Sequence, residues 1–125
     1  MAVISFAKNE PERIWCVAGW AFRQVLDDVV SQYPKDTEMA DEFDHSKDYS
    51  GLILYMLSPE FAARITNAIR HVATGILSGT IRSGIHDQPY GDAVTVEQYR
   101  RALRLLLETI PSHGEVIDSE DRRVE

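Results

Sequence analysis

Apolar residues recur every three or four positions along most of the chain, which is the spacing of one helix face. The first such stretch follows Asn9 and Pro11 and continues to Tyr33. Asn9 can cap this helix, and proline is tolerated in the first turn. Pro34 disfavours helical geometry in the residue before it, so we expect one long helix that ends near Tyr33. Residues 2–7 alternate weakly between apolar and polar, and we expect a short strand or an irregular arm there.

Two further helical stretches begin with a clear capping residue. Asp36 or Thr37 can cap a short helix that runs to about His45. Ser58 can cap the next helix, which has proline at its first position, and Gly79 is a common terminator at its end. The middle of the chain is therefore expected to hold two helices.

The remaining segments are less regular. Residues 49–57 form an almost continuous apolar run, which periodicity cannot assign to a strand or a helix; we favour a helix from its context. Residues 80–94 show no period and are expected to form a long connection. Thr95 and Gln98 match a capping box, so we expect a last helix over residues 96–110.

Length and composition fit a single folded unit. The chain has 125 residues, of which 44% are hydrophobic, and this is enough to bury one core. We therefore expect a mainly α fold over residues 1–111, one compact domain of four to five helices packed like a bundle. Residues 112–125 carry few large apolar side chains among many charges, and we expect an acidic, flexible tail.

The negative charge of the chain is concentrated in one block. The formal net charge is -7, and residues 27–48 hold eight carboxylates against two lysines, which gives -6. Residues 111–125 contribute -3, and the other segments are slightly positive. Such a charge distribution repels nucleic acid and anionic membrane surfaces. We therefore expect a protein partner with a basic surface, and neither a nucleic acid nor a membrane as partner.

The single cysteine bears on the cellular compartment. Cys16 cannot form an internal disulfide or supply a cysteine metal site. Its apolar neighbours in the predicted first helix suggest a reduced, packed thiol. The first residues lack the features of a signal peptide, and no apolar run is long enough to span a membrane. We expect a cytoplasmic protein.

Candidate metal-binding and catalytic residues are few. Glu42 and His45 have the Glu-x-x-His spacing of di-iron helical bundles, but those bundles need two such pairs and two more glutamates. A solvated acidic face explains the pair better. His86 beside Asp87 offers acid–base groups, yet adjacent loop residues seldom orient each other and no activated serine or cysteine is evident. We assign no catalytic, cofactor-binding or metal-binding residue and expect a protein that is not an enzyme.

Arginines cluster on the last predicted helix, at Arg100, Arg101 and Arg104. Glu97 and Glu108 lie three or four positions from members of this cluster, which is the spacing of helical ion pairs. Aromatic residues do not interleave with the arginines as base stacking would require. We therefore expect an exposed face with paired charges rather than a nucleic-acid contact.

Without a catalytic constellation, the chain is most simply a non-catalytic protein-binding module, monomeric or homodimeric. In size and acidity it is similar to bacterial immunity proteins, which neutralise a cognate, often basic, toxin by occluding its active site; no motif carries this similarity. The alternative is a small helical enzyme or metal-binding protein that uses the 80–94 loop or the Glu42 and His45 pair. The expected partner-binding residues are Asp36, Glu38, Asp41, Glu42, Asp44 and Asp48 in the acidic block, and Arg82, His86, Asp87 and Tyr90 in the loop.

Overall fold

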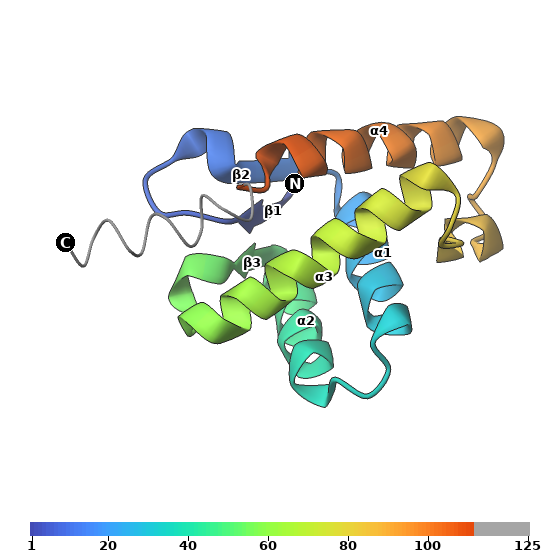
Figure 1. Ribbon diagram of the computed structural model, residues 1–125. Helices are drawn as coiled ribbons and strands as arrows, with labels where there is room; N and C mark the ends of the chain where they lie inside the picture. Colours follow the sequence, from blue (N-terminus) through green and yellow to red (C-terminus); the bar gives the residue numbers. More distant parts are fainter. Residues whose placement is uncertain (112–125) are drawn as a thin grey trace.

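The computed structural model describes residues 1–111 and shows a mainly helical domain with a small sheet at one end (Figure 1). In chain order its elements are β1 (Ala2–Ser5), the 3-10 turn η1 (Pro11–Arg13), β2 (Ile14–Val17), α1 (Gly19–Gln32), α2 (Thr37–Tyr49), β3 (Gly51–Ile53), the 3-10 turn η2 (Leu54–Met56), α3 (Pro59–Ser78), the 3-10 turn η3 (Gly84–Asp87) and α4 (Ala93–Thr109). The long helix α3 packs against both α1 and α4, so it lies at the centre of the helical layer.

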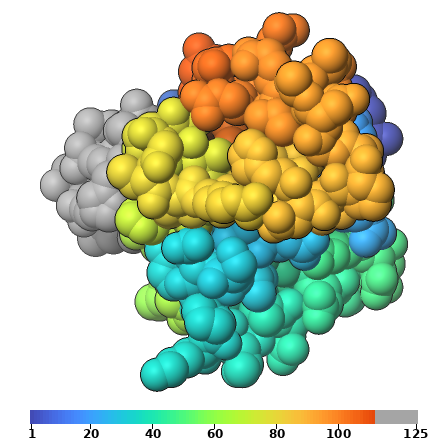
Figure 2. Space-filling model, turned by 90° about the vertical axis from the view of Figure 1, so that its right-hand side faces the viewer, coloured from blue at the N-terminus to red at the C-terminus, as the bar shows by residue number. Residues whose placement is uncertain are grey.

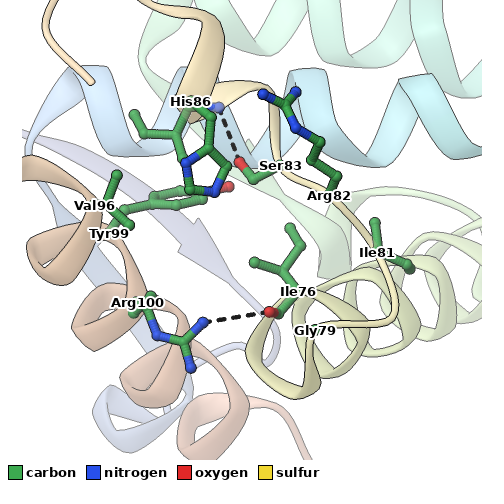
Figure 3. A pocket seen from close by; sticks show the side chains of 10 residues that line it. Ile76, Gly79, Ile81, Arg82, Ser83, His86, Val96, Tyr99 and Arg100 are labelled. Atoms are coloured by element: carbon green, nitrogen blue, oxygen red, sulfur yellow. Dashed lines mark hydrogen bonds between the residues drawn. The ribbon is translucent and has the colours of Figure 1, made fainter. Parts of the chain in front are cut away.

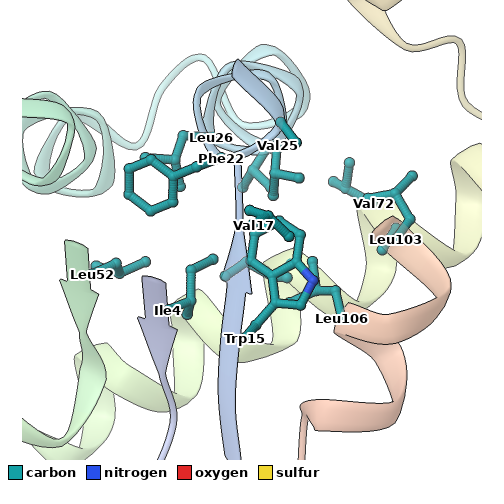
Figure 4. Packing of buried hydrophobic residues seen from close by; sticks show 14 of the residues in the cluster. Ile4, Trp15, Val17, Phe22, Val25, Leu26, Leu52, Val72, Leu103 and Leu106 are labelled. Atoms are coloured by element: carbon teal, nitrogen blue, oxygen red, sulfur yellow. The ribbon is translucent and has the colours of Figure 1, made fainter. Parts of the chain in front are cut away.

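The three strands form a sheet in which β1 is central, antiparallel to β2 and parallel to β3. Ile4 of β1 lies opposite Trp15 on one side and Leu52 on the other. Because successive side chains of a strand point to opposite faces, these three residues share one face of the sheet. All three are buried, and Figure 4 shows them directed toward the helices.

The hydrophobic core fills the space between this face and the helices. Full burial of each large apolar side chain stabilises the fold by roughly 1.5–3 kcal/mol. The indole Nε1 of Trp15 also donates a hydrogen bond of 3.0 Å to the carbonyl oxygen of Ala102, which fixes the edge strand β2 against α4. The core side chains drawn in Figure 4 include Phe22, Val25 and Leu26 of α1, Val72 of α3, and Leu103 and Leu106 of α4.

The helix boundaries predicted from capping residues are confirmed in the middle of the chain. The side chain of Asp36 accepts a hydrogen bond from the backbone nitrogen of Met39, and that of Ser58 accepts one from Phe61. Gly79 ends α3 with a φ of 86°, a left-handed conformation that favours glycine. These local signals act within one turn, which is why the sequence reveals them.

The prediction of one helix from Pro11 to Tyr33 is wrong. Its first part forms η1 and β2, and α1 begins only at Gly19. Trp15 and Val17 alternate with exposed residues along β2 and face the core. Pairing with β1 satisfies this period of two, and a partner so far along the chain is invisible to the local helical pattern.

The prediction of a buried thiol at Cys16 is wrong for the same reason. Cys16 is exposed because it lies on the outer face of β2, next to the buried Trp15. The neighbouring outward position, Ile14, is 40% exposed. A strand places adjacent residues on opposite faces, so apolar neighbours in sequence do not bury this cysteine.

The prediction of a helix over residues 49–57 is also wrong. Helix α2, expected to end near His45, continues to Tyr49 and is followed by β3 and η2. Leu52 is buried in the sheet, but Tyr49 and Met56 are 73% and 76% exposed. The apolar run therefore buries Leu52 and Leu54 and leaves Tyr49, Tyr55 and Met56 exposed.

Residues 80–94 are not a plain connection. They contain η3, and α4 already begins at Ala93. The cap of α4 is Asp92, whose Oδ1 accepts a hydrogen bond of 2.8 Å from the backbone nitrogen of Thr95, and this bond lowers the pKa of Asp92. The predicted capping box of Thr95 and Gln98 is therefore wrong, because an acceptor three residues earlier takes its place.

The mainly helical class is confirmed, and residues 1–111 hold four α-helices. The expected N-terminal strand is β1, although the complete three-stranded sheet was not expected. The segment interpreted as a tail, residues 112–125, lies outside the described residues. Among the helices within residues 1–111, none is long and apolar enough to cross a membrane.

Candidate functional site

Helix α2 separates a buried apolar side from an exposed acidic side. Its buried residues are Met39, Phe43 and Ser46. At the opposite positions Asp41, Asp44 and Asp48 are exposed. Glu42, one turn before the buried Ser46, is half-buried at the edge of this side. We call Asp41, Glu42, Asp44 and Asp48 the acidic face of α2.

Two basic residues neutralise the carboxylates at the margins of this surface. Arg64 of α3 binds both Asp36, at 3.0 Å, and Glu38. The hydrogen bond with Glu38, assisted by Asp36, raises the pKa of Arg64 above its ordinary value. The predicted contact residues Asp36 and Glu38 are thus already engaged within the domain. Lys47 pairs in the same way with Asp27 of α1.

The acidic face itself is largely without cations. Lys47 approaches Asp44 only to 3.9 Å. Within residues 1–111, no ion pair reaches Asp41, Glu42 or Asp48. These carboxylates cluster within two turns of a rigid helix, so they form a negative surface that water and a partner can reach.

An aromatic side chain lies at the C-terminal end of the acidic face. Tyr49 is 73% exposed, and its ring contacts that of His45 with 4.8 Å between the ring centroids. His45 is itself exposed one turn after Asp41. Exposed tyrosines combine apolar area with a polar hydroxyl, a combination enriched in protein interfaces.

Asp28 is not part of the acidic surface, although it lies in the acidic block of the sequence. It is 4% exposed on the side of α1 that faces η3. Without it, seven carboxylates against two lysines leave residues 27–48 with a surface charge of -5. The expectation that the whole block forms one surface is therefore wrong for Asp28, and the surface has one negative charge fewer than expected.

The Asp28 carboxylate instead joins α1, η3 and α4. Its Oδ1 accepts hydrogen bonds from Gln24 Nε2 at 3.0 Å and from the backbone nitrogen of Gly84 at 2.9 Å. Its Oδ2 accepts from Ser83 Oγ at 2.5 Å and from the hydroxyl of Tyr99 at 2.6 Å. Four donors satisfy a buried charge for which the described residues supply no cation. We call these five residues the Asp28 network.

The Asp28 network also keeps Tyr99 neutral. Burial, together with the adjacent charge of Asp28, raises the pKa of Tyr99 well above its ordinary value of 10.0. Tyr99 therefore acts as a hydrogen-bond donor rather than as a general base. Sequence reasoning missed this network, although Asp28 lies three positions after Val25 and seven after Ala21, on the apolar side of α1.

The candidate residues of the 80–94 segment do not form one cluster with α2. Arg82 and Asp87 form a two-point ion pair with distances of 2.9 and 3.0 Å. Their hydrogen bonds raise the pKa of Arg82 and lower that of Asp87. Tyr90 packs edge-on against Trp20 of α1, with 6.3 Å between the ring centroids.

The 80–94 segment lies on α1 and not on the acidic face. Figure 2 shows this gold to orange segment directly above α1. Within residues 1–111, no hydrogen bond or ion pair joins the segment to α2. The two sets of predicted contact residues therefore belong to separate surfaces.

A pocket of about 260 Å³ opens beside the 80–94 segment. Figure 3 shows Arg82 and His86 on one side of it and Arg100 of α4 on another. We call it the η3 pocket. It is lined by Ile76, Gly79, Ile81, Arg82, Ser83, Ile85, His86, Val96, Tyr99 and Arg100.

The arginines of α4 differ from their expected pairing. Arg104, rather than Arg100 or Arg101, pairs with Glu97, at 3.4 Å. Arg100 donates hydrogen bonds to the carbonyl oxygens at the end of α3, to Ile76 at 3.4 Å and to Leu77 at 3.0 Å. A cation here adds a donor at the C-terminal end of α3, where the carbonyl of Ile76 also accepts from the backbone nitrogen of Gly79.

Ser83 and the Glu42 and His45 pair bear on the expectations for catalysis and metal binding within residues 1–111. The hydroxyl of Ser83 donates to Asp28 and accepts from the backbone nitrogen of Ile85, so it is not activated by His86. No group of three His, Cys, Asp or Glu side chains that could hold a metal ion occurs in this part of the chain. The Glu42 and His45 pair therefore has no third ligand among the described residues.

Comparisons with known proteins supply no relative. No protein-family model, no curated protein and no solved structure matches the chain.

Proposed function

We propose that this protein is a non-catalytic binding module that recognises a basic protein through the acidic face of α2. The observation that carries the proposal is the set of three exposed aspartates on one side of a single helix, at Asp41, Asp44 and Asp48. Opposite potentials on two surfaces steer the partners together and accelerate association.

The contrast with the margins of the surface supports this proposal. Asp36 and Glu38 are engaged by Arg64, and Asp27 is engaged by Lys47. The basic residues near α2 thus bind the carboxylates at the edges of the surface, and the charges of Asp41 and Asp48 remain unpaired within residues 1–111. A partner would meet the fewest competing cations at these two positions.

Tyr49 gives the surface a second kind of contact. Its 73% exposed side chain follows directly after Asp48, so an apolar anchor adjoins the negative charges. Interfaces commonly combine an aromatic anchor with a polar rim. We infer that Tyr49 contributes to the lifetime of the complex, whereas the carboxylates set the rate at which it forms.

The narrowest form of the proposal is an inhibitor of the immunity type, a cytoplasmic protein that covers the active site of a basic toxin. Its support is the small size of the chain, its net charge of -7 and the exposed carboxylates of α2. Such an inhibitor would act as a monomer or a homodimer and needs no catalytic group.

The test is co-purification from the native host at low salt, followed by kinetic measurement with the captured protein. We expect a companion with a strongly basic surface. The triple variant Asp41→Asn, Asp44→Asn, Asp48→Asn should associate with it at least about tenfold more slowly at low salt. The salt dependence of the association rate should also weaken, because fewer charges are screened.

A matched control removes the same number of charges elsewhere. Glu10, Glu12 and Glu108 are exposed and lie outside α2, so their change to glutamine alters net charge equally. This control should associate nearly as fast as the wild type. Equal slowing of both variants would show a dependence on net charge alone, and undiminished binding of the first variant would exclude the acidic face.

A further inference from the structure

The η3 pocket has walls from three parts of the chain that are held rigidly together. Ile76 and Gly79 come from the end of α3, and Val96 comes from α4. The third wall, with Ser83 and the residues after it, is fixed to α1 and α4 by the Asp28 network. The pocket is therefore preformed rather than dependent on a mobile loop.

Basic side chains, and no carboxylate, line the η3 pocket. Arg82, His86 and Arg100 line it, and the lining contains no aspartate or glutamate. This is unexpected in a chain with a net charge of -7. The local excess of nitrogen donors distinguishes the pocket from the acidic face of α2.

Arg100 and His86 keep hydrogen-bond donors that no group within residues 1–111 uses. Arg100 donates to α3 through Nη1 and Nη2, and its Nε–H has no partner within residues 1–111. The imidazole of His86 likewise makes no hydrogen bond within this part of the chain. Arg82 forms a two-point ion pair with Asp87, which offsets its charge, so the anion site depends on Arg100 and His86.

The carboxylates of Asp28 and Asp87 lie near the pocket but do not line it. Asp28 lies behind the wall formed by Ser83 and Tyr99, and both of its oxygens already accept two hydrogen bonds. Asp87 is exposed and bound to Arg82. Neither oxygen pair is among the groups that line the pocket.

Four aliphatic side chains also line the pocket, beside Gly79, Ser83 and Tyr99. Ile76, Ile81, Ile85 and Val96 surround the polar groups, and Ile85 is 1% exposed. A ligand that fills such a pocket gains by transferring apolar surface from water. An inorganic ion alone would leave this surface unused.

From this combination we propose that the η3 pocket binds a small amphipathic anion, a carboxylate or phosphate monoester on a short aliphatic chain. Arg100 and His86 donate to the anionic group, and the aliphatic part packs on Ile76, Ile81 and Val96. The proposal is independent of the acidic face, which lies on another surface.

The test is a titration of the whole protein, followed by its amide NMR signals. The probes share one chain length: hexanoate, hexyl phosphate, hexanamide and hexylamine, with inorganic phosphate as the ion alone. We expect hexanoate or hexyl phosphate to shift signals of residues 76–100 and to bind at least about tenfold more tightly than hexanamide, since hydrogen bonds to charged groups are the stronger ones. The better of these two anions identifies the preferred head group.

Variants locate the binding in the pocket. His86→Gln and Arg100→Gln should each weaken binding of the preferred anion by about tenfold. Arg104→Gln, one turn further along α4 and outside the lining, should not. Because Arg100 also binds the end of α3, Val96→Phe serves as a second variant that narrows the pocket and leaves Arg100 in place; it too should weaken binding.

Several outcomes would overturn the proposal. It fails if hexanamide or hexylamine binds as tightly as the anions, if inorganic phosphate binds as tightly as hexyl phosphate, or if none of the probes shifts residues 76–100. Unchanged anion binding by folded His86→Gln and Val96→Phe would also overturn it. The triple aspartate variant of α2 should bind the anion normally, so this test and that of the proposed function fail separately.

Discussion

Asp28 and the carboxylates of the acidic face are close in sequence, yet their surroundings are opposite. Asp28 is 4% exposed and accepts four hydrogen bonds. Asp41 and Asp48 are exposed, and no ion pair reaches them within residues 1–111. The first group is bound entirely within the domain, and the others are directed to the solvent.

This difference shows that aspartates of one chain can have two separate roles, one in stabilising the fold and one at the surface. Burying a carboxylate costs free energy unless hydrogen-bond donors surround it. The folded state therefore needs the donors of Ser83, Gly84 and Tyr99 to lie next to Asp28. An exposed carboxylate keeps its water and imposes little on the fold. Net charge adds both kinds together, and only the exposed part is available to a partner.

The largest expected loss of stability comes from removing an acceptor oxygen of Asp28. Asp28→Asn keeps the size of the side chain but replaces one acceptor oxygen with a donor. The donors that faced this oxygen lose their partner, and we expect a loss of about 3 kcal/mol or more in the free energy of unfolding. Urea denaturation followed by circular dichroism measures it.

The neighbouring residue provides the control for that variant. Asp27 is exposed and pairs with Lys47, so Asp27→Asn should cost less than about 1 kcal/mol. Similar losses for the two variants would mean that burial and hydrogen bonding do not distinguish Asp28 from a surface carboxylate.

The second variant removes one donor from the Asp28 network. Tyr99→Phe leaves the ring packed but removes the 2.6 Å hydrogen bond to Asp28. A hydrogen bond to a charged acceptor contributes about 1.5–3 kcal/mol, so we expect a loss in this range at neutral pH. Thermal denaturation of the two proteins at pH 7 measures it.

The raised pKa of Tyr99 predicts the direction in which the stability of the protein changes with pH. Its pKa in the folded protein is raised well above 10.0, so above pH 10 the unfolded chain releases the Tyr99 proton and the folded protein retains it. Stability must then fall as pH rises from about 10. Tyr99→Phe should lose stability less steeply in this window, and parallel slopes would contradict the raised pKa.

The sequence predicts those parts of the fold that depend on neighbours along the chain. Asp36, Ser58 and Gly79 act within one turn of their own helix, and all three are found as expected. The strand β2 depends on its pairing with β1, and no local pattern contains that partner. Helical spacing therefore extended the first helix over a segment that forms a strand.

The candidate site shows the same division. Exposed Asp41 and Asp44 follow from the helical period of the predicted segment. Asp48 lies beyond its expected end near His45, and it joins this face because α2 continues to Tyr49. The Asp28 network could not, because Tyr99 lies 71 positions from Asp28 and the two meet only through tertiary packing. The η3 pocket likewise needs the end of α3 beside α4.

A third variant tests whether the wall that carries Ser83 and Gly84 must keep its shape. In Gly91→Ala the new methyl group would overlap the carbonyl oxygen of Ile85, so the turn between η3 and α4 has to shift. We expect a loss of about 1–2 kcal/mol, typical of overpacking, with weaker anion binding in the η3 pocket. Gly19→Ala is the control because no atom outside its chain neighbours and its own helix backbone lies within 4 Å of the added carbon; it should not destabilise the protein.

The smallest expected change in stability is that of the triple aspartate variant of α2. The variant Asp41→Asn, Asp44→Asn, Asp48→Asn should change the free energy of unfolding by less than about 0.5 kcal/mol per site, as is usual for exposed positions. Reduced repulsion between neighbouring carboxylates on one helix acts in the stabilising direction. A large loss would show that these residues support the fold, as Asp28 does, and would remove the reason for assigning them to a partner. Unchanged stability together with slower association would separate the two roles of aspartate in this chain by measurement.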